Sequence, residues 1–177
     1  MDKNQRRVLA VLMMRFGLNP YEAIPLASQW FLTHPTASWS TLSKLLLTGE
    51  VILKNGILHD VTPTEIKILT NQMRGQNGIE IKNRWYSFKL YPKCFTGVDA
   101  VDWFVKTQQV TREEAIQIGE MLIARQIIHH VHDAHNFKDE YLFYRFYVDE
   151  KVATYSESNS ELASENVRSR IIGQDLV

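Results

Sequence analysis

The first fifty residues show apolar side chains at the three- and four-residue spacing that is typical of amphipathic helices. Ala23, Ala27 and Trp30 share this spacing in the second of three such segments. A glycine or a proline follows each segment, as is usual where a helix ends. The pattern therefore predicts three helices, at residues 4–16, at residues 21–34 and from residue 38 or 40 to residue 48.

Two short apolar runs come next, with Asn55 and Gly56 between them. This dipeptide is a strong signal for a tight hairpin turn, because both residues accept a positive φ. Three helices followed by a hairpin is the element order of a winged helix. The same order occurs in other helical subdomains, so two interpretations of residues 1–61 stay open: a winged-helix-like domain or a plain helical one.

Another helix is predicted to begin after Thr62. Thr62 and Glu65 have the spacing of a capping box, and Pro63 suits the first helical position. The helix should run to about Arg74. No Gly/Ser-rich linker precedes it, so the two halves of the chain that meet near residues 60–62 are expected to pack together.

The helix predicted after Thr96 is apolar over most of its surface, including Val101, Trp103 and Phe104. Thr96 can cap its first turn, where Asp99 places a carboxylate near the positive end of the helix dipole. Because a helix that is apolar on most sides is usually buried, we expect this helix inside a domain, with Trp103 as a candidate core residue.

The rest of the chain alternates between strand and helix patterns until residue 150. Gly119 lies inside a predicted helix at residues 112–126, at a cost of up to ~1 kcal/mol relative to alanine, so close packing is expected there. The other predicted elements are a hairpin arm at residues 79–90, with its turn at Tyr86 and Ser87, and strands at residues 127–133 and 142–148.

Four separated motifs follow one another in this second half. They are Gly-Ile-Glu-Ile-Lys-Asn-Arg at residues 78–84, Cys-Phe-Thr-Gly-x-Asp-Ala-Val-Asp-Trp at 94–103, Arg-Glu-Glu-Ala at 112–115 and Phe-Lys-Asp at 137–139. Their order and spacing resemble the DEP domain, named in part after Dishevelled and pleckstrin, over roughly residues 62–148. The resemblance implies a winged-helix-like helical bundle with a β-hairpin arm, and a docking role in signalling.

We therefore expect an α+β protein in three parts. The polar stretch after residue 150 is poor in apolar residues and is predicted to be disordered. The expected parts are a helical N-terminal domain at residues 1–61, a DEP domain at residues 62–150 and a disordered tail at residues 151–177.

The composition narrows the expected partners and location. The 20 basic and 20 acidic side chains cancel, whereas general nucleic-acid binders are usually basic. No apolar run approaches the ~18 residues of a transmembrane helix. The single cysteine, Cys94, allows no disulfide within the chain and fits a reducing compartment. We expect a cytoplasmic protein that can associate peripherally with a membrane.

The sequence gives little reason to expect catalysis or metal binding. His130, His132 and His135 could approach one another, but no cysteine neighbours them, so we expect structural histidines, no metal and no cofactor. Asp99 and Asp102 lie three apart on one helix, which suits a cap and a surface ion pair better than a catalytic pair. No nucleophile motif or glycine-rich phosphate loop occurs, so we expect no enzyme activity.

The hairpin arm carries the candidate binding residues. Cations interleaved with aromatic side chains can bind lipid headgroups or a protein. In DEP domains similar to that of Dishevelled, a hairpin finger and nearby cations are implicated in membrane and receptor contact. The candidate membrane- or partner-binding residues are Lys82, Arg84, Trp85, Lys89 and Lys93.

Two functions from different classes follow. The first is non-enzymatic docking in intracellular signal transduction, to a signalling protein or an anionic phospholipid surface. The alternative is a transcriptional regulator that binds DNA through the N-terminal half. Lys44 is the only cation of the candidate recognition helix at residues 40–48 and Lys54 the only one of the wing. Phosphate affinity grows with the number of cations in contact, so nucleic acid is not an expected partner.

Overall fold

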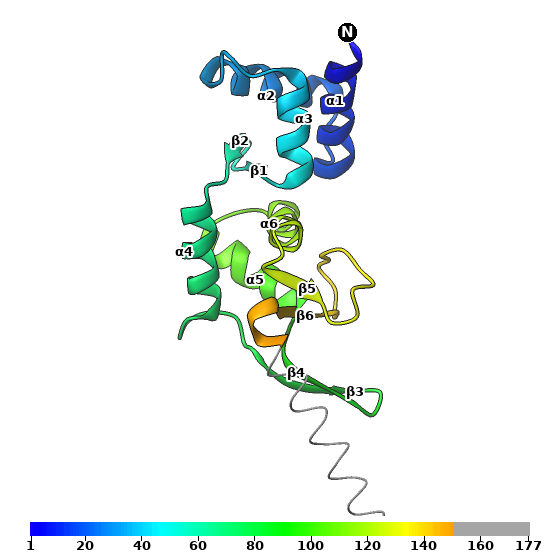
Figure 1. The fold of residues 1–177 in the computed structure, drawn as a ribbon, viewed down its shortest axis with the longest axis vertical. Helices are drawn as coiled ribbons and strands as arrows, with labels where there is room; N and C mark the ends of the chain where they lie inside the picture. The colour runs from blue at the N-terminus through cyan, green and yellow to red at the C-terminus, as the bar shows by residue number, and fades with distance from the viewer. Residues whose placement is uncertain (151–177) are drawn as a thin grey trace, which may run out of the picture.

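The computed structural model describes residues 1–150; the predicted tail, residues 151–177, lies outside the described residues. Figure 1 shows the described chain as two packed groups of elements, one above the other. The upper group is α1 (Lys3–Phe16), α2 (Pro20–Thr33), α3 (Trp39–Thr48), β1 (Val51–Lys54) and β2 (Ile57–Asp60). The three helices and the hairpin predicted for this half are confirmed.

The second group holds the remaining elements. A four-stranded antiparallel sheet has the order β3-β4-β6-β5. The elements are α4 (Pro63–Arg74), β3 (Lys82–Tyr86), β4 (Lys89–Thr96), α5 (Gly97–Gln108), α6 (Arg112–Ala124), β5 (Ile128–His130), β6 (Phe143–Phe146) and a 3₁₀ turn at Tyr147–Asp149. The α+β class is confirmed, while a winged-helix-like N-terminal half stays a prediction.

Side chains at the helix starts explain where the helices of the second group begin. The Thr62 hydroxyl accepts the backbone N–H of Glu65, whose carboxylate accepts the N–H of Thr62 in return. Thr111 and Glu114 repeat this reciprocal pair at the start of α6. Such bonds satisfy N–H groups that lack partners inside a helix, so the predicted starting points are confirmed.

The core of the second group is built around α5, as predicted, but with a different aromatic residue. Phe104 is fully buried together with Ala100 and Val101. Trp103 is only half-buried, and its indole Nε1 donates to the backbone oxygen of Asn77 at 2.9 Å. The expectation that Trp103 is a core residue is corrected, because the buried face of α5 follows the spacing of residues 97, 100, 101 and 104.

Gly119 packs as the sequence indicated. The ring of Phe137 lies directly against the helix at this position, so that a Cβ built on Gly119 would lie 2.1 Å from the Cδ1 of Phe137. Phe137 is itself buried. The cost of a glycine inside α6 is thus offset by the approach of an aromatic ring, and the predicted close packing is confirmed.

The two halves contact each other, as the missing linker indicated. Ile52 of β1 belongs to the hydrophobic core of the second half. Arg15 of α1 donates from Nε to Glu120 of α6 at 3.1 Å. Gly49, with φ +70°, sits against Met121, where a Cβ would lie 3.1 Å from the Met121 Cγ. The domain boundary at residue 61 stays a prediction.

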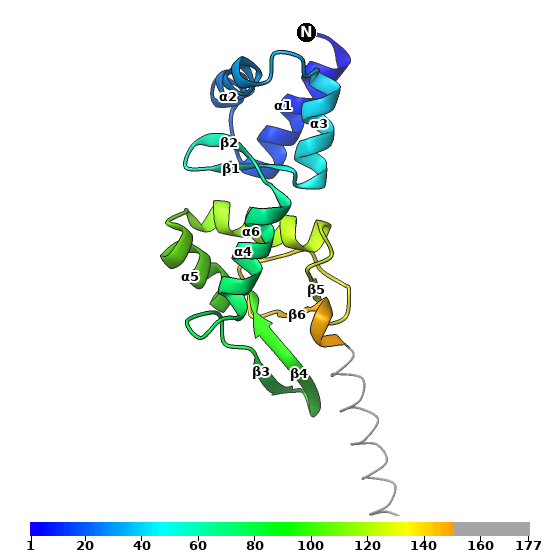
Figure 2. The same cartoon turned by 60° about the vertical axis from the view of Figure 1, so that its left-hand side comes forward.

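Figures 1 and 2 both show the β3–β4 hairpin extending from the body at the end opposite the N-terminal helices. Its turn lies at Ser87 and Phe88, one residue later than predicted, because Tyr86 pairs with Lys89. Within residues 1–150, no helix combines the length and the apolar character needed to cross a membrane.

Candidate functional site

The β3–β4 hairpin is irregular near its base. The strand register shifts between Lys82 and Arg84, opposite Pro92, which has no N–H to offer to the ladder. The backbone N–H of Lys93 is instead bound by the side-chain oxygen of Asn83 at 3.0 Å, and Lys93 has φ 50°. A bulge of this kind twists and re-aims a strand, so the outer part of the hairpin takes its own direction.

The tip of the hairpin exposes aromatic side chains. Phe88 is fully exposed, Trp85 is 72% exposed and Tyr86 is 59% exposed. Ser87 and Phe88 both adopt positive φ, 48° and 63°. For a bulky side chain this conformation is a true outlier, and strain of this kind clusters at functional sites. Phe88 was not among the predicted site residues, although an aromatic residue in a tight turn was a readable signal.

Three of the predicted lysines flank these aromatic side chains, and all three are exposed. Lys82 pairs with Glu80 at 2.6 Å, which lowers the pKa of the Glu80 carboxyl. The Lys89 ammonium lies 5.6 Å from the centre of the Tyr91 ring. Lys93 forms no ion pair with any residue between 1 and 150. The structure thus brings these lysines together with Trp85 on one projecting hairpin.

Arg84, the remaining predicted site residue, has a different position. It is only 8% exposed. Its guanidinium donates to the backbone oxygens of Cys94 and Glu80, the latter at 3.3 Å, and to the Asp99 carboxylate at 3.2 Å. Arg84 therefore links the hairpin to the first turn of α5. Its donors are therefore used inside the protein and are not presented to a partner outside it.

The histidines at residues 129–135 have structural partners. His129 lies 2.9 Å from carboxylate oxygens of both Asp133 and Glu150. His130 accepts the backbone N–H of His132 at 3.2 Å. Burial, followed by the neighbouring histidines, lowers the pKa of His130. Among the described residues, no group of three or more His, Cys, Asp or Glu side chains is placed to hold a metal ion.

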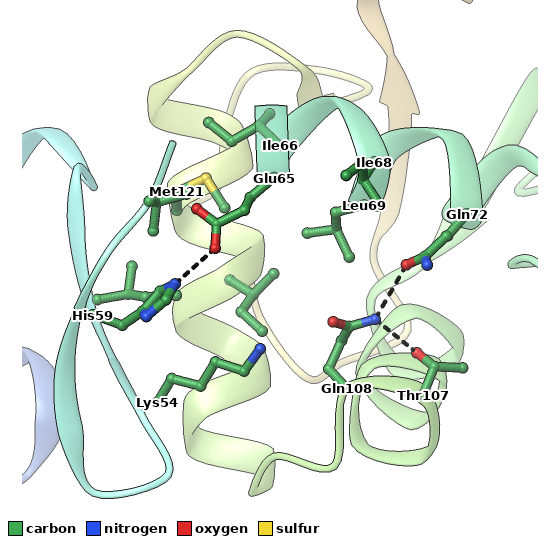
Figure 3. Close-up of a pocket in the computed structure, with 13 residues that line it drawn as sticks. Lys54, His59, Glu65, Ile66, Ile68, Leu69, Gln72, Thr107, Gln108 and Met121 are labelled. Atoms are coloured by element: carbon green, nitrogen blue, oxygen red, sulfur yellow. Dashed lines mark hydrogen bonds and ion pairs between the residues drawn. The ribbon is translucent and has the colours of Figure 1, made fainter. Parts of the chain in front are cut away.

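A groove lies where the two halves of the chain meet (Figure 3), with a volume of about 300 Å³. Apolar side chains of α4 and α6, including Leu69 and Met121, form much of its wall, and Lys54 of β1 reaches into it. Gln72 and Gln108 face each other across its rim with a long 3.5 Å contact. The groove thus belongs to the contact between the halves.

Glu65, at the edge of this groove, makes the stability of the fold depend on pH. It accepts the backbone N–H and the hydroxyl of Thr62, both at 2.7 Å, and lies 2.9 Å from His59 Nε2. These bonds, those from Thr62 first, lower the pKa of Glu65 from 4.5 to about 2. The ionised form therefore stabilises the fold at any pH above 4.5, and this contribution is lost as the pH falls towards 2.

We expect Glu65→Ala to lower the free energy of unfolding by about 1 kcal/mol at pH 7, because the start of α4 loses its reciprocal cap. The difference from the wild type should shrink as the pH falls from about 4.5 to about 2. Urea denaturation at several pH values measures it. Glu113→Ala removes an exposed carboxylate from the first turn of α6 and is the matched control. A difference that is independent of pH would contradict the assigned role of Glu65.

Comparisons with known proteins match this chain to one family model and to parts of larger proteins. Residues 78–146 match the family model described as the domain found in Dishevelled, Egl-10, and Pleckstrin (DEP). The human phosphatidylinositol 3,4,5-trisphosphate-dependent Rac exchanger 2 protein is 35% identical over 98 residues, which is 55% of this chain and 6% of that protein. The vacuolar membrane-associated protein iml1 of Aspergillus terreus is 26% identical over 144 residues, 80% of this chain and 8% of that protein.

The solution structure of the DEP domain of mouse pleckstrin covers 50% of this chain, and 93% of that structure is matched, with 25% identity and a TM-score of 0.44. The chain spans less than a tenth of the length of the two curated relatives above. By its name, the first relative is a Rac exchanger that depends on phosphatidylinositol 3,4,5-trisphosphate, and the second is associated with the vacuolar membrane. The segment that matches the family model contains the hairpin, α5, α6 and the rest of the sheet. This chain therefore contains a DEP domain, at residues 78–146.

Proposed function

We propose that this chain is a non-enzymatic docking module of intracellular signalling, which binds an anionic membrane surface through the tip of the β3–β4 hairpin. The observation that carries the proposal is the exposure of Trp85 and Phe88 on the hairpin that also carries Lys89 and two further exposed lysines, an arm that extends from the body. Two relatives support a membrane setting, since they are named as phosphatidylinositol 3,4,5-trisphosphate-dependent and as vacuolar membrane-associated.

The chemistry of the tip suits the boundary between water and lipid. Aromatic side chains partition into the interfacial region, while a lysine near an anionic bilayer contributes about 1 kcal/mol. Phe88, at the far end of the hairpin, can enter the bilayer surface first. Lys89, beside the turn, then lies at the headgroups, and Lys82 and Lys93 near the base of the hairpin reach them when the arm lies along the surface. The proposed surface keeps four of the five residues named from the sequence, leaves out Arg84 and adds Phe88.

A catalytic role gains no support from the carboxylates that the sequence singled out. Asp99 accepts from Arg84 at 3.2 Å and Asp102 accepts from Arg112 at 2.6 Å. Both are thus engaged in ion pairs, Asp99 in the first turn of α5 and Asp102 in the middle of that helix. Neither of them lines any of the five cavities described at the surface of residues 1–150. This arrangement supports a docking role for the domain.

DNA binding through the N-terminal half remains the alternative with less support. Lys54, the cation of the candidate wing, reaches into the groove between the halves (Figure 3). Lys44 is then the only lysine or arginine of α3 that could reach phosphate. Since the affinity for DNA grows with the number of phosphates that cations neutralise, the expected affinity for duplex DNA is low. Tight, salt-sensitive binding of the full chain to duplex DNA would reverse the order of the two functions.

The lysines of the hairpin test the proposal directly. Replacing Lys82, Lys89 and Lys93 with alanine should weaken binding to phosphatidylserine vesicles on the order of 100-fold at low salt, because each lysine contributes about 1 kcal/mol. Added salt should weaken the binding of the wild type. Vesicle sedimentation measures both effects. The melting temperature should change little, because exposed charges add little to stability.

The matched control replaces Lys3, Lys44 and Lys67, which are equally exposed but lie outside the hairpin. It should bind vesicles as the wild type does, although it loses the same charge. A second variant, Phe88→Gly, should bind vesicles less tightly yet be more stable, because glycine relieves the positive φ of the turn. If the wild-type protein does not bind anionic vesicles at low salt, membrane binding by the hairpin is excluded. Docking to a protein would then be the remaining function.

A further inference from the structure

Beside the hairpin, three tyrosine rings surround Phe143. The ring centres of Tyr86, Tyr91 and Tyr141 lie 6.1, 5.2 and 5.4 Å from that of Phe143. The corresponding angles between ring planes are 88°, 60° and 67°. Phe143 is buried and forms the floor, whereas Tyr86 and Tyr141 are exposed. We call these four residues the tyrosine cage.

The tyrosine cage encloses a half-open cavity of about 230 Å³. The sheet assembles it from distant parts of the chain, because Tyr86 belongs to β3, Tyr91 to β4 and Tyr141 to the segment just before β6. Among the described residues that line the cavity, none carries a carboxylate. The remaining lining residues are His130, Val131, His132, His135 and Leu142.

The lining favours one class of cation. Aromatic ring faces carry negative electrostatic potential, and rings whose faces line a cavity attract a cation placed in it. A primary ammonium also needs acceptors for its three N–H groups, and this lining offers no carboxylate. A trimethylammonium group has no N–H and presents methyl groups to the ring faces. The cage therefore fits a quaternary ammonium better than a lysine side chain.

Lys89 adds a second requirement. Its ammonium lies 5.6 Å from the centre of the Tyr91 ring, beside the cage. A simple cation in the cage would be repelled by Lys89, whereas a ligand with an adjacent anion would be attracted. Tyr86 and Lys89 also flank the turn at Ser87 and Phe88 directly. The cage thus opens next to the part of the hairpin that the proposed function places at the membrane.

We propose that the tyrosine cage binds the phosphocholine headgroup of a membrane lipid, with the trimethylammonium group among the rings and the phosphate towards Lys89. This inference rests on the proposed docking of the hairpin and names one lipid headgroup that it recognises. The rings of Tyr86, Tyr91 and Tyr141 provide the walls for the methyl groups. Phe143, which is 6% exposed, forms the floor that limits the depth of the site.

Titration of the full chain with soluble phosphocholine, followed by NMR, tests the cage. We expect phosphocholine to bind about tenfold more tightly than phosphoethanolamine, which has the same charges but no methyl groups. Tyr141→Ala should weaken phosphocholine binding about tenfold, while Tyr141→Phe keeps the ring and most of the affinity. Tyr21→Ala, which removes an exposed tyrosine of α2, is the matched control and should change nothing.

Lys89→Ala separates the two ends of the ligand. It should weaken phosphocholine binding and leave the binding of tetramethylammonium unchanged or stronger, because only phosphocholine carries a phosphate for Lys89. A spectrum that does not change during the phosphocholine titration overturns the proposal. Tighter binding of a trimethyllysine peptide than of phosphocholine overturns it as well, since the cage would then recognise a protein.

Vesicles distinguish failure of the cage from failure of the docking function. Phosphatidylserine vesicles without choline lipids test docking through the hairpin lysines alone. Tyr141→Ala should bind these vesicles nearly as the wild type does. In mixed vesicles, the wild type should bind more tightly when phosphatidylcholine replaces part of the phosphatidylethanolamine. Tyr141→Ala should not show this gain in affinity. Equal gains for wild type and Tyr141→Ala would contradict the cage while leaving the docking function intact.

Discussion

Replacing Phe104 with alanine should lower the free energy of unfolding by about 3–5 kcal/mol. Phe104 is fully buried in the core of the second half, and its ring lies 6.5 Å from that of Phe137, centre to centre. Phe137 in turn rests against Gly119, where the packing leaves no spare room. The surrounding side chains could therefore do little to fill a cavity left at Phe104, and we expect a loss in the upper part of the 3–5 kcal/mol range, about 4–5 kcal/mol. Urea denaturation at pH 7 measures the loss.

Trp103→Ala is the matched comparison, because it removes the neighbouring aromatic residue of α5. Trp103 is half-buried and contributes one hydrogen bond, to the backbone oxygen of Asn77. Its replacement should cost less than that of Phe104, since part of its surface already contacts water. A larger loss for Trp103→Ala than for Phe104→Ala would show that α5 turns a different face to the core.

Replacing Arg84 with methionine should lower the free energy of unfolding by about 2–3 kcal/mol, because buried carbonyl oxygens lose their donor. Methionine keeps much of the side-chain volume but none of the hydrogen bonds to Cys94, Glu80 and Asp99. The link between the hairpin and the start of α5 would then be missing. Thermal and urea denaturation of the full chain measure the loss.

Arg112→Met is the control for this substitution. Arg112 also pairs with two carboxylates, those of Asp102 and Asp139, but its side chain is 45% exposed. Exposed ion pairs are worth ~1 kcal/mol or less, so Arg112→Met should cost much less than Arg84→Met. Folded Arg84→Met should still bind anionic vesicles. If the Arg84→Met variant is stable but no longer binds vesicles, Arg84 itself contributes to membrane binding.

The elements of this protein were predictable where the signal is local. The cap formed by Thr62 and Glu65, the turn at Asn55 and Gly56, and the approach of another group to Gly119 were all expected from the sequence and are present. Each depends on the φ preference or the hydrogen-bonding capacity of one or two residues. The four ordered motifs likewise indicated the DEP domain, which the family model confirms.

The wrong predictions concern features that contacts between distant parts of the chain decide. Helical spacing alone did not decide whether Trp103 or Phe104 faces the core, because both belong to an apolar helix. Asn55 and Gly56 make their turn visible in the sequence, but Ser87 and Phe88 adopt positive φ without favouring it. Pairing across the sheet fixes that turn, and a pattern along the chain does not contain this information.

The sequence by itself determined the helix starts, the first hairpin, the DEP domain and the gathering of cations on the hairpin arm. Only the tertiary structure decided which of those cations are exposed. Arg84 and Lys82 are two residues apart, yet one is buried against the start of α5 and the other is exposed. The tyrosine cage likewise exists only after folding, because the sheet brings Tyr86, Tyr91 and Tyr141 together from separate segments.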